Sequence, residues 1–124
     1  MINFKNTGVY TLRSGDVSDV MQQLLPMLIE GEMVFAAFQD NKDKIVFTTK
    51  RVIVVNSQGL TGKKKNFTSL PYSKIQAFSF ETAGMPDPDC GMDLFFLGLG
   101  HVRFVFTCGF DIVAFNKIIS RYIL

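Results

Sequence analysis

The spacing of apolar residues changes near Glu32, and this change limits the folds that the chain can adopt. Before it, apolar residues recur every three or four positions, as on one face of a helix. After it, they alternate in short segments separated by turn residues, as in β-strands. No alternation of strands and helices follows, which excludes a parallel α/β sheet. We expect about seven successive antiparallel strands, which must close or stack to protect their edges.

The expected first helix lies before Gly31, where its backbone can leave the helix. Asp16 precedes the helix and can accept hydrogen bonds from its free amides. Pro26 lacks an amide hydrogen and clashes with the preceding turn, so we expect a kink or a break near Leu25. The apolar face comprises Val17, Val20, Met21, Leu24, Leu25 and Leu28.

Turn residues divide the rest of the chain into strands. Asp40 to Asp43 forms a tight polar turn, Pro71 ends one strand, and a change of phase predicts a bulge at Gln76 and Ala77. Residues 83–91 form an irregular loop rich in glycine and proline. The expected strands are Glu32–Gln39, Ile45–Thr49, Val52–Asn56, Lys63–Leu70, Lys74–Thr82, Met92–Leu97 and His101–Thr107.

A second helix is expected to close the chain. Asp111 is placed to cap it, and Phe110 is placed to pack on Phe115 one turn later. A single C-terminal helix can plug the open end of a strand barrel. The expected buried face comprises Ile112, Phe115, Ile119 and Tyr122.

The composition is that of one globular domain. The chain has 124 residues, of which 48% are hydrophobic, and this excludes intrinsic disorder. Thirteen basic residues against 11 acidic ones give a net charge of +2, which does not favour a nucleic-acid partner. We therefore expect one domain over residues 1–124, with residues 1–31 as an N-terminal helical extension and residues 32–124 as barrel and C-terminal helix.

The expected compartment is the cytoplasm. The polar opening sequence has no apolar run of signal-peptide length, and no segment reaches the roughly 20 apolar residues of a membrane span. Without a secretory route, Cys90 and Cys108 are expected to be reduced thiols.

Several separated motifs resemble the bacterial pleckstrin-homology-like (PH-like) domain family. The resemblance extends from Glu32 to the C-terminus. It is carried by Glu32, Ala36-Ala37-Phe38, the run Asp43-Lys44-Ile45-Val46-Phe47-Thr48-Thr49-Lys50-Arg51, Gln58-Gly59, Thr61-Gly62-Lys63-Lys64, Leu70-Pro71-Tyr72 and Phe78-Ser79-Phe80-Glu81-Thr82-Ala83-Gly84.

This resemblance implies a mainly β fold: a bent, seven-stranded antiparallel barrel capped by the final helix. It also implies closed homo-oligomeric rings, pentameric in single-domain members, and no enzymatic activity or cofactor. The residues agree with assembly, because Met33–Phe38, Val52–Val55 and Leu94–Leu97 are apolar on both faces. The first helix can cover part of that surface, and a neighbouring subunit is expected to cover the rest. The alternative is that the helix alone covers these strands.

Ligand sites are weakly supported by the sequence. In the turn at residues 40–44 two acids cancel two bases, and the Lys63-Lys64-Lys65 run cannot converge on one phosphate because side chains alternate along a strand. The segment Asp87–Asp93 lacks the ligand spacing of a calcium loop. His101 has no recognisable nucleophile motif beside it. We expect no metal and no catalysis.

A polar cluster near strand ends is the predicted interaction surface. It could dock a protein partner where strands of adjacent subunits meet, or it could form a solvated turn or an intersubunit salt bridge. The leading hypothesis is a self-assembling protein-interaction module; the alternative is a peripheral binder of anionic lipids or phosphoinositides. The cluster comprises Thr49, Lys50, Arg51, Lys63, Lys64, Glu81 and Thr82.

Overall fold

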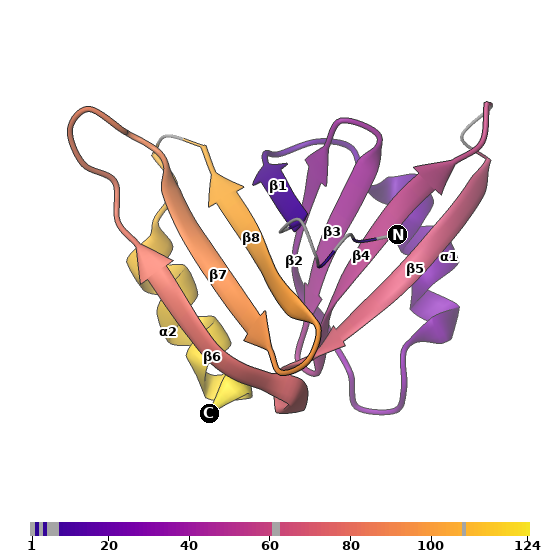
Figure 1. Cartoon of the computed structure of the whole chain (residues 1–124). Helices are drawn as coiled ribbons and strands as arrows, with labels where there is room; N and C mark the ends of the chain where they lie inside the picture. Colours follow the sequence, from indigo (N-terminus) through magenta and orange to yellow (C-terminus); the bar gives the residue numbers. More distant parts are fainter. Residues whose placement is uncertain (1, 3, 5–7, 61–62, 108) are drawn as a thin grey trace. The chain divides into compact units, whose positions relative to one another are not determined.

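A computed structural model describes residues 2, 4, 8–60, 63–107 and 109–124 of the chain. It contains eight strands, two α-helices and two short 3₁₀ helices (Figure 1). The strands form two four-stranded sheets, with the orders β2-β3-β4-β5 and β1-β8-β7-β6. The chain divides into two compact units, Arg13–Pro71 and a second unit made of Ile2–Leu12 and Tyr72–Leu124. The fold is mainly β with a C-terminal helix, as expected, although its two sheets do not close into a barrel.

The first unit is an antiparallel sheet with a helix on one face. Its strands are β2 (Val34–Asp40), β3 (Asp43–Thr48), β4 (Arg51–Gln58) and β5 (Lys64–Pro71). The predicted turn before Asp43 is confirmed: Asp40 pairs with Asp43, and Asn41 takes the positive φ of 51° that such a tight turn needs. Pro71 ends β5, because it cannot donate to a further ladder bond.

Helix α1 (Ser18–Leu24) continues into the 3₁₀ helix η1 (Leu25–Met27), which contains Pro26. The predicted break at Leu25 is therefore confirmed. The Asp16 carboxylate accepts a hydrogen bond from the Ser18 amide at the start of α1, at 3.0 Å. Asp16 thus supports the helix start, although the capping position itself is Val17.

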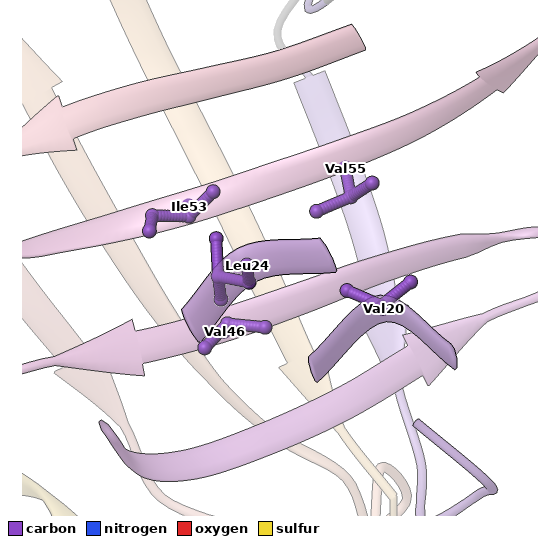
Figure 2. Packing of buried hydrophobic residues seen from close by; sticks show 5 residues of the cluster. All are labelled: Val20, Leu24, Val46, Ile53 and Val55. Atoms are coloured by element: carbon purple, nitrogen blue, oxygen red, sulfur yellow. The ribbon is translucent and has the colours of Figure 1, made fainter. Parts of the chain in front are cut away.

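The face of the sheet under α1 forms the core of this unit. Figure 2 shows Val20 and Leu24 of α1 directed at side chains of β3 and β4. All members of this cluster are at most 2% exposed. Burial of such a side chain contributes about 1.5–3 kcal/mol, so this contact fixes α1 to the sheet. The cluster comprises Val20, Leu24, Val46, Ile53 and Val55.

The apolar residues of β4, Val52–Val55, are all buried. Ile53 and Val55 lie under α1, while Val52 and Val54 on the opposite face are also buried within the same chain. Cover of exposed apolar strand surface by a neighbouring subunit stays a prediction. Apolar surface remains elsewhere: Met33 is 68% exposed and Leu97 is 82% exposed.

The second unit contains a strand that the sequence did not predict. Strand β1 (Gly8–Leu12) pairs in parallel with β8 (Gly100–Phe106), as Figure 1 shows. The other strands are β6 (Ile75–Glu81), which follows the 3₁₀ helix η2 (Tyr72–Lys74), and β7 (Cys90–Phe96). The predicted bulge is confirmed by the register shift between Ile75 and Ala77. Gly8–Leu12 therefore belongs to the second unit, whereas the chain from Arg13 onward belongs to the first.

Helix α2 (Ile112–Ile123) has the predicted start. The Asp111 carboxylate accepts a hydrogen bond from the Ala114 amide at 3.0 Å, and the rings of Phe110 and Phe115 lie 5.5 Å apart. Ile112, Phe115 and Ile119 are buried as expected. Tyr122 departs from the expectation, because it is 40% exposed and stacks on Tyr72 at the edge of the helix contact.

Candidate functional site

A buried ion pair in the first unit lies where the chain leaves η1 and enters β2. The side chain of Glu32 is fully buried, and its carboxylate accepts hydrogen bonds from Arg51 Nε at 2.9 Å and Nη2 at 3.0 Å. The Thr48 hydroxyl donates to the same carboxylate at 2.6 Å, and the Ile29 amide donates at 3.1 Å. A buried carboxylate with this many donors is satisfied as an anion.

The environment of Glu32 favours its charged form. Burial by itself would raise the pKa of this carboxyl, but the hydrogen bonds from Arg51, Thr48 and the Ile29 amide outweigh burial. The pKa of Glu32 therefore lies below its ordinary value. The pair with Arg51 is consequently present at neutral pH.

This ion pair fixes the backbone of residues 25–33, which we call the Leu25–Met33 segment. The Arg51 guanidinium also reaches the Met27 carbonyl, at 3.5 Å. At the end of the segment, the Met33 amide donates to Thr49 Oγ1 at 3.2 Å, and the Met33 carbonyl accepts a hydrogen bond from the Thr49 amide at 2.9 Å. The β3–β4 turn therefore holds the segment at both its middle and its end.

The segment carries four exposed apolar side chains. Between them, Leu28 alone packs against the core under α1. Apolar side chains on a backbone that hydrogen bonds hold in place form a preorganised surface, and methionine is enriched in such interfaces. The exposed residues are Leu25 at 55%, Met27 at 50%, Ile29 at 59% and Met33 at 68%.

The structure distributes the seven residues of the predicted interaction surface over three places. Thr49, Lys50 and Arg51 lie at the β3–β4 turn, where Thr49 and Arg51 hold the Leu25–Met33 segment. Lys63 and Lys64 lie at the opposite end of β4, since Lys64 pairs with Gln58 while Arg51 pairs with Pro71. Along β4 that separation is about 23 Å. The first unit alone therefore does not bring these two groups together.

The remaining two residues, Glu81 and Thr82, belong to the second unit. Glu81 Oε1 accepts a hydrogen bond from Arg103 Nη2 at 2.7 Å, and Arg103 Nη1 donates to Asp93 Oδ2 at 2.6 Å. Burial would lower the pKa of Arg103, but the contacts with Glu81 and Asp93 outweigh it and raise that pKa. Thr82 is exposed just after β6. Glu81 is therefore part of an ion-pair network across β6, β7 and β8.

A glycine makes room for this network. Gly91 of β7 lies beneath the Arg103 guanidinium, and a Cβ atom at this position would lie 2.6 Å from Nη2. The absence of a side chain lets the guanidinium lie against the strand. Gly91 therefore supports the position from which Arg103 reaches both carboxylates.

The same sheet face places Ser79, Asp93 and His101 on adjacent strands. Ser79 lies opposite Asp93 in the β6–β7 register, and His101 Nε2 lies 3.3 Å from Asp93 Oδ1. In a serine-type triad the imidazole must contact the hydroxyl, whereas here the carboxylate lies between the two. His101 instead stacks on Phe95, with ring centroids 4.8 Å apart. This arrangement does not support nucleophilic catalysis.

Four lysines from two hairpins line one groove of the first unit. The turn between β2 and β3 provides Lys42 and Lys44, and the start of the β5 hairpin arm provides Lys63 and Lys65. Asp16 and Asp19 line the α1 side of the same groove. Lys64 does not line it, as strand alternation requires.

The convergence of these lysines revises the assessment made from the sequence. Asp43 was expected to offset the charge of the turn; its carboxylate keeps its charge but does not line the groove, and it accepts hydrogen bonds from Asn56 Nδ2 and from the Ser57 amide, both at 3.1 Å. The two hairpins together therefore bring more lysines to one place than either sequence run suggested.

The structure describes Cys90 and every His, Asp and Glu of the chain. In the part of the chain that it describes, no group of three or more His, Cys, Asp or Glu side chains is placed to hold a metal ion. Cys90 is buried, and Cys108 lies outside the described residues. No helix among the described residues is long and apolar enough to span a membrane.

Two groups of residues were missed by the sequence reasoning. The Leu25–Met33 segment was missed because Leu25 and Leu28 were attributed to a longer helix and Met33 to the first strand. Pro26 followed by Met-Leu-Ile indicates apolar residues beyond the helix end. The Asp93–Arg103 pair could have been found, because a hairpin centred on Gly98 places these residues opposite one another.

The sequence matches the bacterial PH domain family over residues 3–123. The chain therefore belongs to the bacterial PH domain family. Nothing in this family assignment names a ligand or a partner.

One relative is similar to this chain over part of its length. An uncharacterized protein of Bacillus subtilis (strain 168), YjqA, is 49% identical over 79 residues, which are 64% of this chain and 63% of YjqA. The chain thus matches somewhat less than two thirds of that relative's length.

Two solved structures are similar to this chain. A crystal structure of a DUF1696 family protein with a pleckstrin-homology domain from Shewanella loihica PV-4 has a TM-score of 0.76 and 32% identity, covering 93% of this chain and 99% of the other. A pleckstrin homology domain from Shewanella amazonensis SB2B has a TM-score of 0.62 and 36% identity, with 90% of each chain covered.

Proposed function

We propose that this chain is a non-enzymatic, cytoplasmic binding module that assembles into a closed homo-oligomeric ring, with five copies favoured, and presents a repeated polar surface to a protein partner. The observation that carries the proposal is the exposed, hydrogen-bonded Leu25–Met33 segment. The ring follows from the resemblance seen in the sequence motifs.

The segment suits an interface because its backbone is already fixed. Ordering a loop upon association costs free energy, and a preorganised loop avoids that cost. The ion pair that fixes this loop also has a cost in free energy, because Glu32 must be desolvated. Hydrophobic packing alone would hold a loop without this cost. A surface of this kind supports association with another protein surface better than exposure to water.

The repeated polar surface of the proposal includes Lys50 and Lys64, both of which are exposed. Each copy in a ring would present these lysines once. Repetition would convert weak single contacts into strong overall binding.

Light scattering coupled to gel filtration tests the assembly. We expect the wild-type chain at micromolar concentration to have a mass several times that of one copy, and we expect Ile29→Asp to reduce it. Ile118→Asp is the matched control, because Ile118 is 43% exposed on α2, away from the segment in sequence and in the second unit. A wild-type monomer at this concentration would refute the proposal.

Affinity capture from native lysate tests the partner. We expect Lys50→Glu and Lys64→Glu to lose proteins that the wild type retains. Capture of the same proteins by both variants would show that the polar surface lies elsewhere.

A second candidate function is binding of anionic lipid headgroups, and the lysine groove favours it. Lys42, Lys44, Lys63 and Lys65 line this groove together. Several converging cations are what a phosphorylated headgroup requires. Two aspartates in the same lining reduce the positive charge, so this candidate ranks second.

Sedimentation with phosphatidylserine vesicles over a salt series tests this candidate. The expected result is binding that falls with salt and that Lys63→Glu and Lys65→Glu weaken. Lys64→Glu is the matched control, since it changes the same charge in the same run outside the groove lining. Absence of salt-sensitive sedimentation would exclude the candidate.

A further inference from the structure

A second exposed apolar surface lies in the other unit, at the tip of the β7–β8 hairpin. Phe95 is 38% exposed, Leu97 is 82% exposed and Leu99 is 57% exposed. In Figure 1 this hairpin joins the ends of β7 and β8. We call these three residues the hairpin patch. Single exposed apolar residues are ordinary, but three within five positions form a contiguous surface.

The backbone at this tip is also fixed. Gly98 and Gly100 both have positive φ, of 80° and 124°, a region that favours glycine. The Leu99 amide donates to the Phe96 carbonyl at 3.2 Å, closing the turn. Like the Leu25–Met33 segment, the hairpin patch therefore presents its side chains from an ordered backbone.

The two surfaces differ in charge. Glu30 is exposed within the Leu25–Met33 segment, directly after Ile29. Lys74 is exposed beside the hairpin patch, where it lines a shallow depression with Leu97 and Leu99. Glu30 and Lys74 are opposite in charge and can pair across the two surfaces, while exposed Lys50 also lies at the β3–β4 turn beside the segment. A surface against its own copy would place two Glu30 or two Lys74 side chains together.

We propose that the hairpin patch of one copy docks on the Leu25–Met33 segment of a second copy. This inference rests on the proposed self-assembly and specifies its interface. Phe95, Leu97 and Leu99 pack against Leu25, Met27, Ile29 and Met33, and Lys74 lies near Glu30 at the rim.

This contact has the type of symmetry that a ring requires. Each chain has one copy of each surface, and the two surfaces are different. Such a heterologous contact leaves one free surface of each kind after every addition, so the assembly continues until it closes. Contacts between identical surfaces would instead stop at a dimer.

Two variants that each disable one surface give the decisive experiment. Leu97→Asp disables the hairpin patch, and Ile29→Asp disables the segment. By light scattering, we expect each variant alone to be monomeric. Mixed in equal amounts, the two are expected to form a 1:1 dimer and nothing larger, because one intact patch can meet one intact segment.

Other outcomes separate this inference from the proposed function. An oligomeric wild type with an unaffected Leu97→Asp variant would overturn the interface and leave self-assembly standing. A monomeric wild type would overturn both. If the mixture stays monomeric although circular dichroism shows both variants folded, the pairing of these two surfaces is wrong.

A charge exchange tests the rim independently. Glu30→Lys and Lys74→Glu each place like charges at the contact, and we expect each to weaken assembly roughly fivefold. The double variant restores opposite charges and is expected to recover the wild-type concentration dependence. Additive weakening in the double variant would contradict the proposed proximity of Glu30 and Lys74.

Discussion

Arg51 and Glu32 form a bidentate ion pair, in which Arg51 Nε donates to Glu32 Oε2 at 2.9 Å and Nη2 donates to Oε1 at 3.0 Å. The carboxylate is buried, while 23% of the arginine side chain remains exposed. The pair connects the β3–β4 turn to the segment before β2 and so fixes residues 28–33, which lie in neither a helix nor a strand.

Replacing Glu32 by Gln should destabilise the fold by about 2–3 kcal/mol at pH 7, because the partly buried Arg51 loses its counter-charge. The folded pKa of Glu32 lies below the value of 4.5 expected in the unfolded chain. Its stabilisation is therefore complete above pH 4.5 and is lost as the pH falls through the folded pKa. Thermal melts between pH 7 and 3 should show that the difference in melting temperature between the wild type and the variant becomes smaller in acid. Glu30→Gln serves as the exposed control. A difference in melting temperature that did not depend on pH would contradict the role of the Glu32 charge.

Replacing Leu24 by Ala should remove about 3 kcal/mol of unfolding free energy, because Leu24 is 1% exposed and its loss leaves a cavity beneath α1. Urea titration at a fixed protein concentration measures this. Leu60→Ala is the control, since Leu60 is fully exposed. Equal midpoints for the two variants would mean that α1 does not pack as described.

Replacing Gly91 by Ala should displace the Arg103 guanidinium, since the new Cβ would lie 2.6 Å from Nη2. The arginine is flexible at that end, so the expected loss is about 1 kcal/mol, from weakened contacts with Asp93 and Glu81. In an Arg103→Met background the same glycine substitution should cost less, which a double-mutant cycle measures. Gly84→Ala is the control, because a Cβ there meets nothing within 4 Å. Strict additivity would show that Gly91 does not act through Arg103.

Replacing Asp111 by Ala should cost about 1 kcal/mol through loss of the cap on the Ala114 amide. Asp111→Asn keeps an accepting oxygen and should retain most of the stability. Thermal denaturation followed by circular dichroism distinguishes the two. Equal losses from both substitutions would indicate that charge, and not the hydrogen bond, is responsible.

Local features of the fold were predictable from local sequence. The break at Pro26, the turn before Asp43, the bulge at Gln76 and the Asp111 cap each depend on residues within a few positions of one another. Strand β1 was not predicted, because its partner β8 lies about ninety residues further along the chain. Five residues carry too little periodicity to identify such a pairing.

The candidate site was predictable only in part, for a related reason. The motif residues Thr49 and Arg51 were recognised, but their contacts with Met27 and Met33 depend on how the chain returns to the sheet after α1. The lysine groove was discounted because each hairpin was considered separately, whereas Lys42 and Lys63 come together only in the folded sheet.

The parallel pairing of β1 with β8 has a consequence for synthesis on the ribosome. Residues 13–71 form one compact unit that is contiguous in sequence. Gly8–Leu12 is made before that unit, yet its partner strand follows about ninety residues later in the chain. The nascent chain must therefore keep Gly8–Leu12 available, without a ladder partner from β8, until residues 100–106 have been made.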